Sequence, residues 1–345
     1  MISIFNTRTM LEALEEMRTP NTFLVKKFFS KQVECPSESV DIDVYKGKRR
    51  VAVYVNPRAV GQTVDRIGYT TYTYKPPYVK PKMPTTAEDL LKRLPGEILY
   101  ANNISNEQRA SIQLGKDLAE LDAIISRAEE LQAQQALFDA TITVKDIDGN
   151  NVVDDIAFPR EASHTVDLTA TGQTAWDATG ANPLEDLRTW RRLNLKDSGV
   201  ASNIVIMGSD AVDIFLENSE VKSALDNRKF DIGSLVMEAQ ELGVTYVGRI
   251  EGMDIYSYDE WYIDPATGTE GAIVPEKKVL VGSTFARCER VYGAIRDVEA
   301  GLAAVARFPK TWVENDPSVR WLQLHSAPLL VPVQVDAFTV ATVLA

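Results

Sequence analysis

The residue types that most often perform chemistry are few and scattered in this chain. Only two histidines occur, His164 and His325, and neither lies near a cysteine, an Asp-rich run or an HExxH motif. The two cysteines, Cys35 and Cys288, are far apart and lack the spacing of metal ligands. We therefore expect two structural histidines, two idle thiols without redox chemistry, and neither a metal nor another cofactor.

The usual nucleophile and phosphate-binding motifs do not occur either. The chain has no GxSxG, no GxGxxG and no phosphate loop of the form GxxxxGKS or GxxxxGKT. Asp146, Asp148 and Asn150 have the first three ligand spacings of a calcium-binding EF-hand, but Asn151 and Ala157 stand where that loop requires glycine and glutamate. A calcium loop is therefore not expected here.

Two pairs of adjacent carboxylates are the remaining candidates for acid–base chemistry, Glu129-Glu130 and Asp154-Asp155. Acidic residues are abundant in this chain, 49 against 37 basic ones, so that adjacency alone does not indicate a catalytic pair. We expect both pairs to lie on solvated faces. The sequence nominates no enzyme; a hydrolase with an unrecognised carboxylate site is the alternative that would contradict this.

Length and composition are those of an ordinary globular protein. The chain has 345 residues, of which 45% are hydrophobic and 25% charged, and this is long enough for two or three domains with a real core. No run approaches the ~18 consecutive apolar residues that span a bilayer, and the charged N-terminal segment lacks the apolar stretch of a signal peptide. We expect a protein that stays in a cytoplasm and does not bind a membrane.

Charge is distributed unevenly along the chain. Residues 45–95 contain eleven basic and three acidic residues, a net charge of +8, whereas the whole chain carries −12. Two hypotheses fit this asymmetry: the basic stretch binds nucleic acid, or it lies on the acidic body of a second copy in an assembly. The overall acidity favours the assembly.

The elements that position these residues begin with an arm and a loop. The apolar patch of residues 23–29 must be buried against something, and residues 40–44 alternate like a strand. Residues 50–56 and 69–74 have the β-branched and aromatic content of two further strands, which we expect to form a long basic hairpin. The proline-rich residues 75–84 then predict an extended, polyproline-like connector.

A long helix is predicted over residues 105–139. Ser105 and Gln108 form a capping box, and apolar residues then recur at steps of three and four. About 34 residues at 1.5 Å each would give ~50 Å, so we expect a spine helix lying across a sheet. Residues 141–158 predict a hairpin that turns at 148–150.

The rest of the chain mixes helices and strands without an alternating βαβ series, which indicates an α+β fold. Helices are predicted at 183–199, 209–217 and 235–243. Strands are predicted at 204–207, 246–249, 255–258, 279–282, 302–308 and 320–324.

Several short segments follow one another along the chain in a recognisable order. The N-terminal and central ones are YVKPK at 78–82, RLP at 93–95, VK at 221–222, LD at 225–226 and Arg228. The stronger C-terminal ones are Gly282, Ala286-Arg287, YGAI at 292–295, ARFPKTWV at 306–313, DP at 316–317 and SAPL at 326–329. Through these segments the chain resembles the major capsid proteins of lambda-type tailed bacteriophages, the phage major capsid protein E family. The likeness spans nearly the whole chain and is weakest between about 140 and 200; it rests on the number and order of the matches.

The resemblance implies the Hong Kong 97 type capsid fold. It implies an N-terminal arm (1–45), an extended hairpin loop (46–95), a peripheral domain with the spine helix (96–180), an axial domain (181–298) and return strands that complete both domains (299–345). The expected function is that of a structural protein, with no enzymatic activity, that assembles into pentamers and hexamers. These would form an icosahedral head shell around double-stranded DNA, without sequence-specific binding.

The resemblance also implies partners and a location. Relatives use a decoration protein, a portal, a transient scaffold and a maturation protease, so we expect these partners, assembly in the cytoplasm of the host bacterium, and a final place in the virion. Lysines in the loop leave a covalent cross-link between subunits formally open.

We expect contacts between subunits from ten residues of the arm and the loop. They are Phe23, Phe28, Phe29, Arg49, Arg50, Tyr54, Arg58, Arg66, Tyr72 and Tyr74. The alternative function is a nucleic-acid-binding protein that uses residues 45–95, with tyrosines 69, 72, 74 and 78 stacked on bases.

Overall fold

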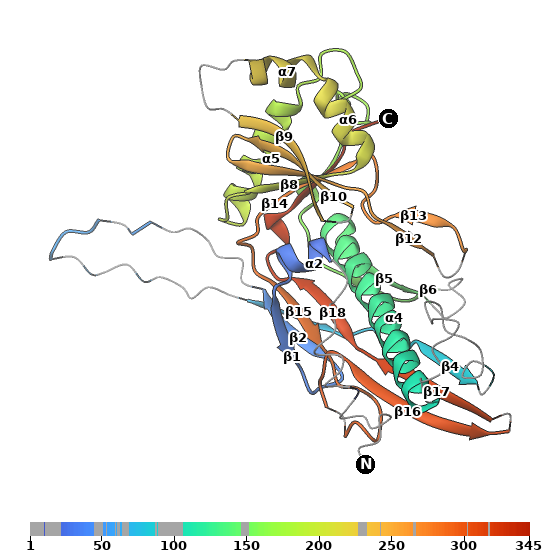
Figure 1. Ribbon diagram of the computed structural model, residues 1–345. Helices are drawn as coiled ribbons and strands as arrows, with labels where there is room; N and C mark the ends of the chain where they lie inside the picture. Colours follow the sequence, from blue (N-terminus) through green and yellow to red (C-terminus); the bar gives the residue numbers. More distant parts are fainter. Residues whose placement is uncertain are drawn as a thin grey trace.

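The fold has two halves joined by a long helix (Figure 1). The computed structural model describes residues 10, 22–44, 51–52, 54–58, 60, 63, 69–86, 88, 106–145, 152–226, 233–241, 243–264, 267–301, 303–316 and 318–345. The upper half in Figure 1 is built on a seven-stranded sheet, and the lower half on two three-stranded sheets crossed by the helix α4. No helix among these described residues has the length and apolarity needed to cross a membrane.

The upper sheet is mixed. Its order is β7 (Thr165–Asp167), β19 (Thr339–Thr342), β14 (Lys278–Gly282), β8 (Ile204–Met207), β11 (Met253–Tyr258), β10 (Val244–Ile250) and β9 (Gly233–Glu241). The pairs β7–β19 and β8–β11 are parallel, and the other pairs are antiparallel. All four residues of β8 are buried, because apolar side chains cover both faces of this sheet.

Three helices cover one face of the upper sheet. They are α5 (Pro183–Asp197), α6 (Ser209–Glu217) and α7 (Ser219–Asp226), and they carry Leu187, Trp190 and Phe215 into one core with β8 and β14. The side chain of Asn182 accepts a hydrogen bond from the N–H of Glu185 and so caps α5, as the Asn-Pro start predicts. The predicted helices at 183–199 and 209–217 are confirmed.

The prediction of a helix at 235–243 is wrong, because this segment is the strand β9. Its composition, rich in Leu, Met, Glu, Ala and Gln, favours a helix by local propensity. The segment instead pairs with β10, with Ala239 opposite Thr245 and Leu235 opposite Gly248. Tertiary pairing at the sheet edge therefore overrides the local preference.

The spine helix is confirmed. The helix α4 (Asn106–Gln134) continues into a turn of π-helix, η1 (Gln135–Asp139), and ends at Ala140 in the left-handed conformation. It packs on two three-stranded sheets of the lower half. One has the order β16 (Phe308–Asn315), β17 (Ser318–His325) and β4 (Lys82–Thr86). The other has the order β1 (Lys31–Glu34), β15 (Cys288–Tyr292) and β18 (Pro328–Pro332). Arg160 donates to the carbonyls of Phe138 and Leu137 and so caps the helix end.

Part of the predicted proline-rich connector is a strand. Residues 82–86 form β4, which pairs with β17 at the edge of its sheet, with Pro84 opposite Trp321. Proline has no backbone N–H to donate. An edge strand tolerates it, because one side of such a strand forms no hydrogen bonds within the sheet. The predicted strand at 302–308 is also wrong in position, since β16 begins at Phe308.

The base of the loop is a hairpin, but its strands differ from those predicted. The helix α2 (Phe23–Phe28) and β1 precede β2 (Val40–Val44), which pairs antiparallel with β3 (Thr70–Tyr74). Residues 51, 52 and 54–56 lie in no strand, so the prediction of a strand at 50–56 is wrong for the residues described. Val51 is largely exposed and Tyr54 fully exposed, and among the described residues no strand pairs with the backbone of this segment.

The remaining elements are short. β5 (Thr141–Lys145) and β6 (Val152–Ala157) form the predicted hairpin, whose turn at 148–150 lies outside the described residues. A second small hairpin, β12 (Trp261–Ile263) and β13 (Glu270–Ala272), lies beside α4. Two single turns of 3-10 helix complete the fold, η2 (Ala162–His164) and η3 (Val335–Ala337).

Candidate assembly surfaces and the buried polar seam

The loop exposes several large apolar side chains. Val51 is 87% exposed, Val60 is 93% exposed and Tyr54 is fully exposed. Arg58 is exposed as well, whereas Arg49, Arg50 and Arg66 lie outside the described residues. Large apolar side chains on a projecting loop are typical of a surface that another molecule covers.

Tyr72 and Tyr74 lie at the base of this loop, not at its tip. Their rings stack with centroids 6.3 Å apart, and Tyr74 packs on Phe158 with centroids at 5.4 Å. Tyr74 is buried, and burial raises its pKa to about 12. These two tyrosines therefore anchor the loop to the body of the same chain, and their contact with a neighbouring subunit stays a prediction.

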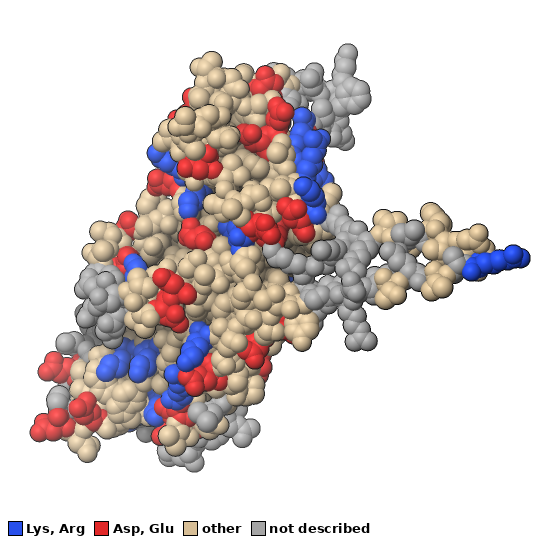
Figure 2. Space-filling model, turned by 180° about the vertical axis from the view of Figure 1, so that it is seen from behind, with Lys and Arg blue, Asp and Glu red and all other residues tan. Residues whose placement is uncertain are grey.

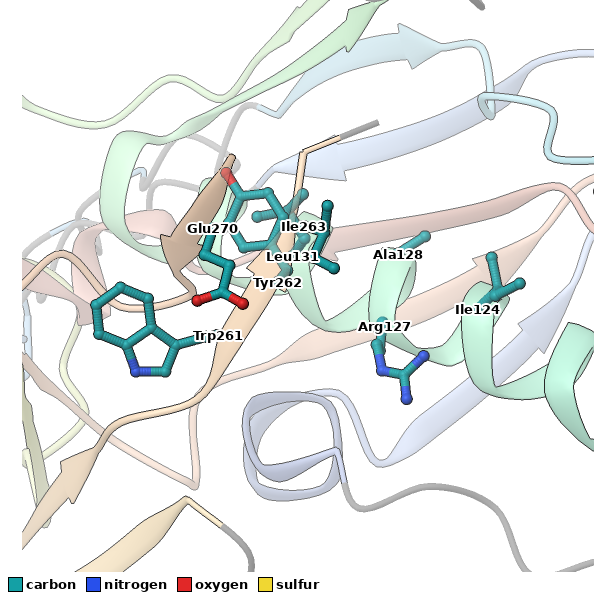
Figure 3. Close-up of a pocket in the computed structure, with 8 residues that line it drawn as sticks. All are labelled: Ile124, Arg127, Ala128, Leu131, Trp261, Tyr262, Ile263 and Glu270. Atoms are coloured by element: carbon teal, nitrogen blue, oxygen red, sulfur yellow. The ribbon is translucent and has the colours of Figure 1, made fainter. Parts of the chain in front are cut away.

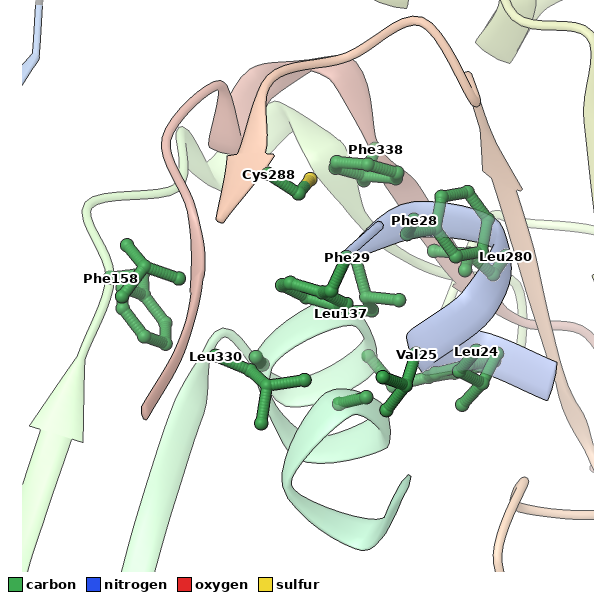
Figure 4. Close-up of a cluster of buried hydrophobic side chains, with 14 of the residues drawn as sticks. Leu24, Val25, Phe28, Phe29, Leu137, Phe158, Leu280, Cys288, Leu330 and Phe338 are labelled. Carbon is green, nitrogen blue, oxygen red and sulfur yellow. The ribbon is translucent and has the colours of Figure 1, made fainter. Parts of the chain in front are cut away.

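The arm phenylalanines are also buried in their own chain. Phe23, Phe28 and Phe29 lie in the largest apolar core, where Phe23 packs on Tyr256 at 5.2 Å and Phe28 on Phe338 at 5.5 Å between ring centroids. Figure 4 shows the arm residues filling the space between α4 and the strands behind it. The aromatic patch does need a partner surface, and a surface of the same subunit supplies one; contacts of these three residues between subunits stay a prediction.

A buried polar seam runs along the face of α4 that meets the lower sheets. Arg307 donates to Asp122 at 2.7 Å and to Glu129 at 2.6 Å, and Tyr292 donates to Glu129 at 3.0 Å. Burial alone lowers the pKa of Arg307, but the carboxylates of Glu129 and Asp122 outweigh it and hold the pKa above its ordinary value. Arg307 therefore keeps its charge at every physiological pH.

The neighbouring carboxylate Glu130 points to the arm. Its oxygens accept the backbone N–H of Leu24 at 2.7 Å and of Val25 at 3.1 Å, and the hydroxyl of Tyr258 at 3.0 Å. Burial raises its pKa to about 7, although these three donors act in the opposite direction. One side chain of α4 thus joins the arm to strand β11 of the upper sheet.

Sequence reasoning missed both carboxylates, since Glu129-Glu130 was expected to be solvated and each is only 2% exposed. The available signal was their phase: Asp122, Ser126 and Glu129 recur at steps of four and three beside the buried stripe of α4. Polar residues at core positions indicate a buried network. The expectation for Asp154 and Asp155 is confirmed, as both are exposed.

An apolar hollow of about 620 Å³ lies between α4 and the small hairpin β12–β13. Figure 3 shows Ile124, Arg127 and Leu131 on the helix facing Trp261 and Ile263 on the hairpin. Trp261 and Ile263 are more than half exposed. No cluster of acidic, histidine or cysteine side chains that could hold a metal ion occurs among the residues described.

The histidines take part in hydrogen-bond networks within the chain. His164 is fully buried and lies within hydrogen-bond distance of Asn194 and Thr339 through Nδ1 and of Asp197 through Nε2. His325 lies 2.6 Å from the hydroxyl of Tyr78. Each is a structural histidine, as expected.

Some of the described basic residues of segment 45–95 contact acidic or aromatic side chains of the same chain. Lys75 lies 3.5 Å from Glu38, and Lys82 stands over the ring of Trp321, 4.4 Å from its centroid. Of the four tyrosines proposed to stack on bases, Tyr74 is buried and Tyr78 bonds to His325, while Tyr69 is exposed. On the face in Figure 2, acidic and basic side chains are intermixed. These contacts do not favour the nucleic-acid hypothesis.

Comparisons with known proteins match nearly the whole chain. The family model described as phage major capsid protein E matches residues 6–343. The major capsid protein of Escherichia phage lambda is 27% identical over 347 residues, covering 98% of each chain, and that of Enterobacteria phage P21 is 28% identical over 351 residues, covering 99% of this chain and 100% of the relative. A crystal structure of a prophage capsid protein from E. coli CFT073 superposes with a TM-score of 0.74 at 19% identity, covering 99% of both chains.

Proposed function

The chain belongs to the phage major capsid protein E family, and we propose that its exposed loop joins copies of the chain in the shell of a phage head. It is a structural, non-enzymatic major capsid protein of Hong Kong 97 type fold. Copies of this protein form the shell. The observation that carries the proposal is the exposure of Val51, Tyr54 and Val60. These large side chains project away from the rest of the chain, so that only another molecule can shield them from water.

The proposal extends to the organisation of the shell. The upper, seven-stranded half would be the axial domain at the centre of pentamers and hexamers, and the lower half with α4 the peripheral domain. The icosahedral shell would enclose double-stranded DNA without reading its sequence, which suits a subunit with a net charge of −12. A decoration protein, a portal, a transient scaffold and a maturation protease are the proposed partners, and assembly would take place in the cytoplasm of the host bacterium.

Electron microscopy tests the proposal most directly. The chain is expressed alone and together with the neighbouring phage genes, and the soluble fraction is imaged in negative stain. Capsomers, tubes or closed shells are the expected result. A stable monomer whose size does not depend on salt or on the co-expressed genes would contradict it.

Charge reversal tests the loop itself. Arg49→Glu with Arg50→Glu is expected to lower the yield of closed shells several-fold while leaving the folded subunit intact, because the pair lies in the basic loop that we assign to the acidic body of a neighbour. Arg192→Glu is the matched control, since Arg192 is exposed on α5 in the upper half. Equal yields from the loop variant and the control would overturn the role of these two arginines.

A further inference from the structure

Glu130 is a buried carboxylate surrounded by donors from two other elements. The arm helix α2 supplies the N–H groups of Leu24 and Val25, and strand β11 supplies the hydroxyl of Tyr258. The side chain itself comes from α4 and is 2% exposed. The arm thus closes over this carboxylate and removes it from water.

The charged groups around Glu130 do not neutralise it. Among the described residues, no lysine or arginine forms an ion pair with Glu130; Lys27 of α2 stands over the rings of Phe23 and Tyr256, 5.7 and 5.3 Å from their centroids. The charge that acts on Glu130 is that of Glu260, just beyond β11, which raises the pKa of Glu130. Glu260 itself accepts a hydrogen bond from the Tyr258 hydroxyl at 3.3 Å. Arg127 on α4 acts to lower the pKa of Glu260. A buried carboxylate without a cation is costly in its charged form.

We propose that Glu130 is a proton-controlled latch for the N-terminal arm: docking of α2 buries this carboxylate and is coupled to the uptake of one proton. This inference concerns the subunit alone and does not rest on how the subunits are arranged in the shell. It gives the chain a means to loosen its arm in response to pH.

The direction of the coupling follows from the burial. With the arm docked, the pKa of Glu130 is about 7, against an ordinary value of 4.5. The docked state therefore binds the proton more tightly, so acidification favours docking and a pH above 7 weakens it. Release of the arm would uncover Leu24, Val25, Phe28 and Phe29, which lie in the main core, and so would free an apolar surface for other contacts.

Hydrogen exchange of the full chain, in unassembled subunits, tests the latch. The readout is the protection factor of residues 22–29, corrected for the intrinsic pH dependence of exchange, with β8 as the reference for global opening. If release returns the carboxyl to its ordinary pKa, protection is expected to rise about 25-fold from pH 8 to pH 5.5. Glu130→Gln should abolish this dependence, since the amide cannot ionise.

Two further variants separate a latch from a merely structural contact. Tyr258→Phe removes a donor that stabilises the anion, so the midpoint of the pH dependence should rise. Glu260→Gln removes a nearby negative charge, so the midpoint should fall. The proposal is overturned if protection of the arm does not vary with pH in the wild type, if the dependence persists in Glu130→Gln, or if neither Tyr258→Phe nor Glu260→Gln moves the midpoint.

Discussion

Glu129 and Glu130 are adjacent on the same helix and equally buried, yet they meet opposite surroundings. Glu129 faces the lower sheets, where Arg307 at 2.6 Å compensates its charge and Tyr292 donates a further hydrogen bond. Glu130 faces the arm and the upper sheet, where it finds only uncharged donors. The partner, and not the depth of burial, therefore distinguishes the two carboxylates: Glu129 has a cation within hydrogen-bond distance, and Glu130 has only uncharged donors.

This difference assigns two mechanical roles to one helix. Charged hydrogen bonds from Arg307 fix α4 to the lower sheets, and Arg307 keeps its own charge over the physiological pH range. The contact of Glu130 with α2 is the weaker joint, because its charged form lacks a cation.

The largest expected effect comes from breaking the seam. Arg307→Ala leaves Glu129 and Asp122 buried without their cation and should lower the free energy of unfolding by about 3–5 kcal/mol. Denaturant titration of unassembled subunits measures it. Arg192→Ala, at an exposed position, should change stability by no more than about 0.5 kcal/mol. A loss at Arg307 as small as that of the control would show that the seam is not a structural brace.

Removing one charge at a time compares the two carboxylates directly. At pH 8, Glu129→Gln should cost about 1.5–3 kcal/mol, because a charged hydrogen bond to Arg307 is lost. Glu130→Gln at the same pH removes a buried charge that has no cation, so its cost should stay below about 1 kcal/mol. Equal losses of unfolding free energy at the two positions would contradict the distinction between them.

The pH dependence of stability sharpens the comparison. Because the pKa of Glu130 is about 7 in the folded protein against 4.5 ordinarily, its contribution is fully present below pH 4.5 and is lost as the pH rises through 7. From pH 8 to pH 5.5 the wild type should therefore gain about 2 kcal/mol relative to Glu130→Gln. Parallel stability curves of the two proteins, measured by denaturant titration at several pH values, would argue against a titrating Glu130.

The elements of this fold are largely readable from the sequence, because their signals are local. The predicted helix at 209–217 coincides with α6, and the capping residue Asn182 marks the start of α5. The strand β9 was missed, since its pairing with β10 outweighs a composition that favours helix. Local patterns therefore succeed at α5 and α6, where no distant partner competes with them.

The site was not readable in the same way. The bonds of Glu130 to Leu24 and of Glu129 to Arg307 join residues 106 and 178 positions apart, so no spacing rule places them together. The sequence did indicate that the aromatic arm needs a partner surface, but it could not tell a surface of the same chain from that of a neighbour. The choice between these two surfaces is made by tertiary packing alone.

The loop tip should behave unlike either carboxylate, with the smallest effect on stability. Tyr54→Ser with Arg58→Glu changes exposed side chains only, so the free energy of unfolding should stay within about 0.5 kcal/mol of the wild type. The yield of closed shells in electron micrographs should nevertheless fall, because the loop, and not the seam, faces other copies in our proposal. Variants of Arg307 would lose shells only in proportion to folded subunit. If the loop variant assembles as well as the Arg192→Glu control, the surface that joins the copies lies elsewhere on the subunit.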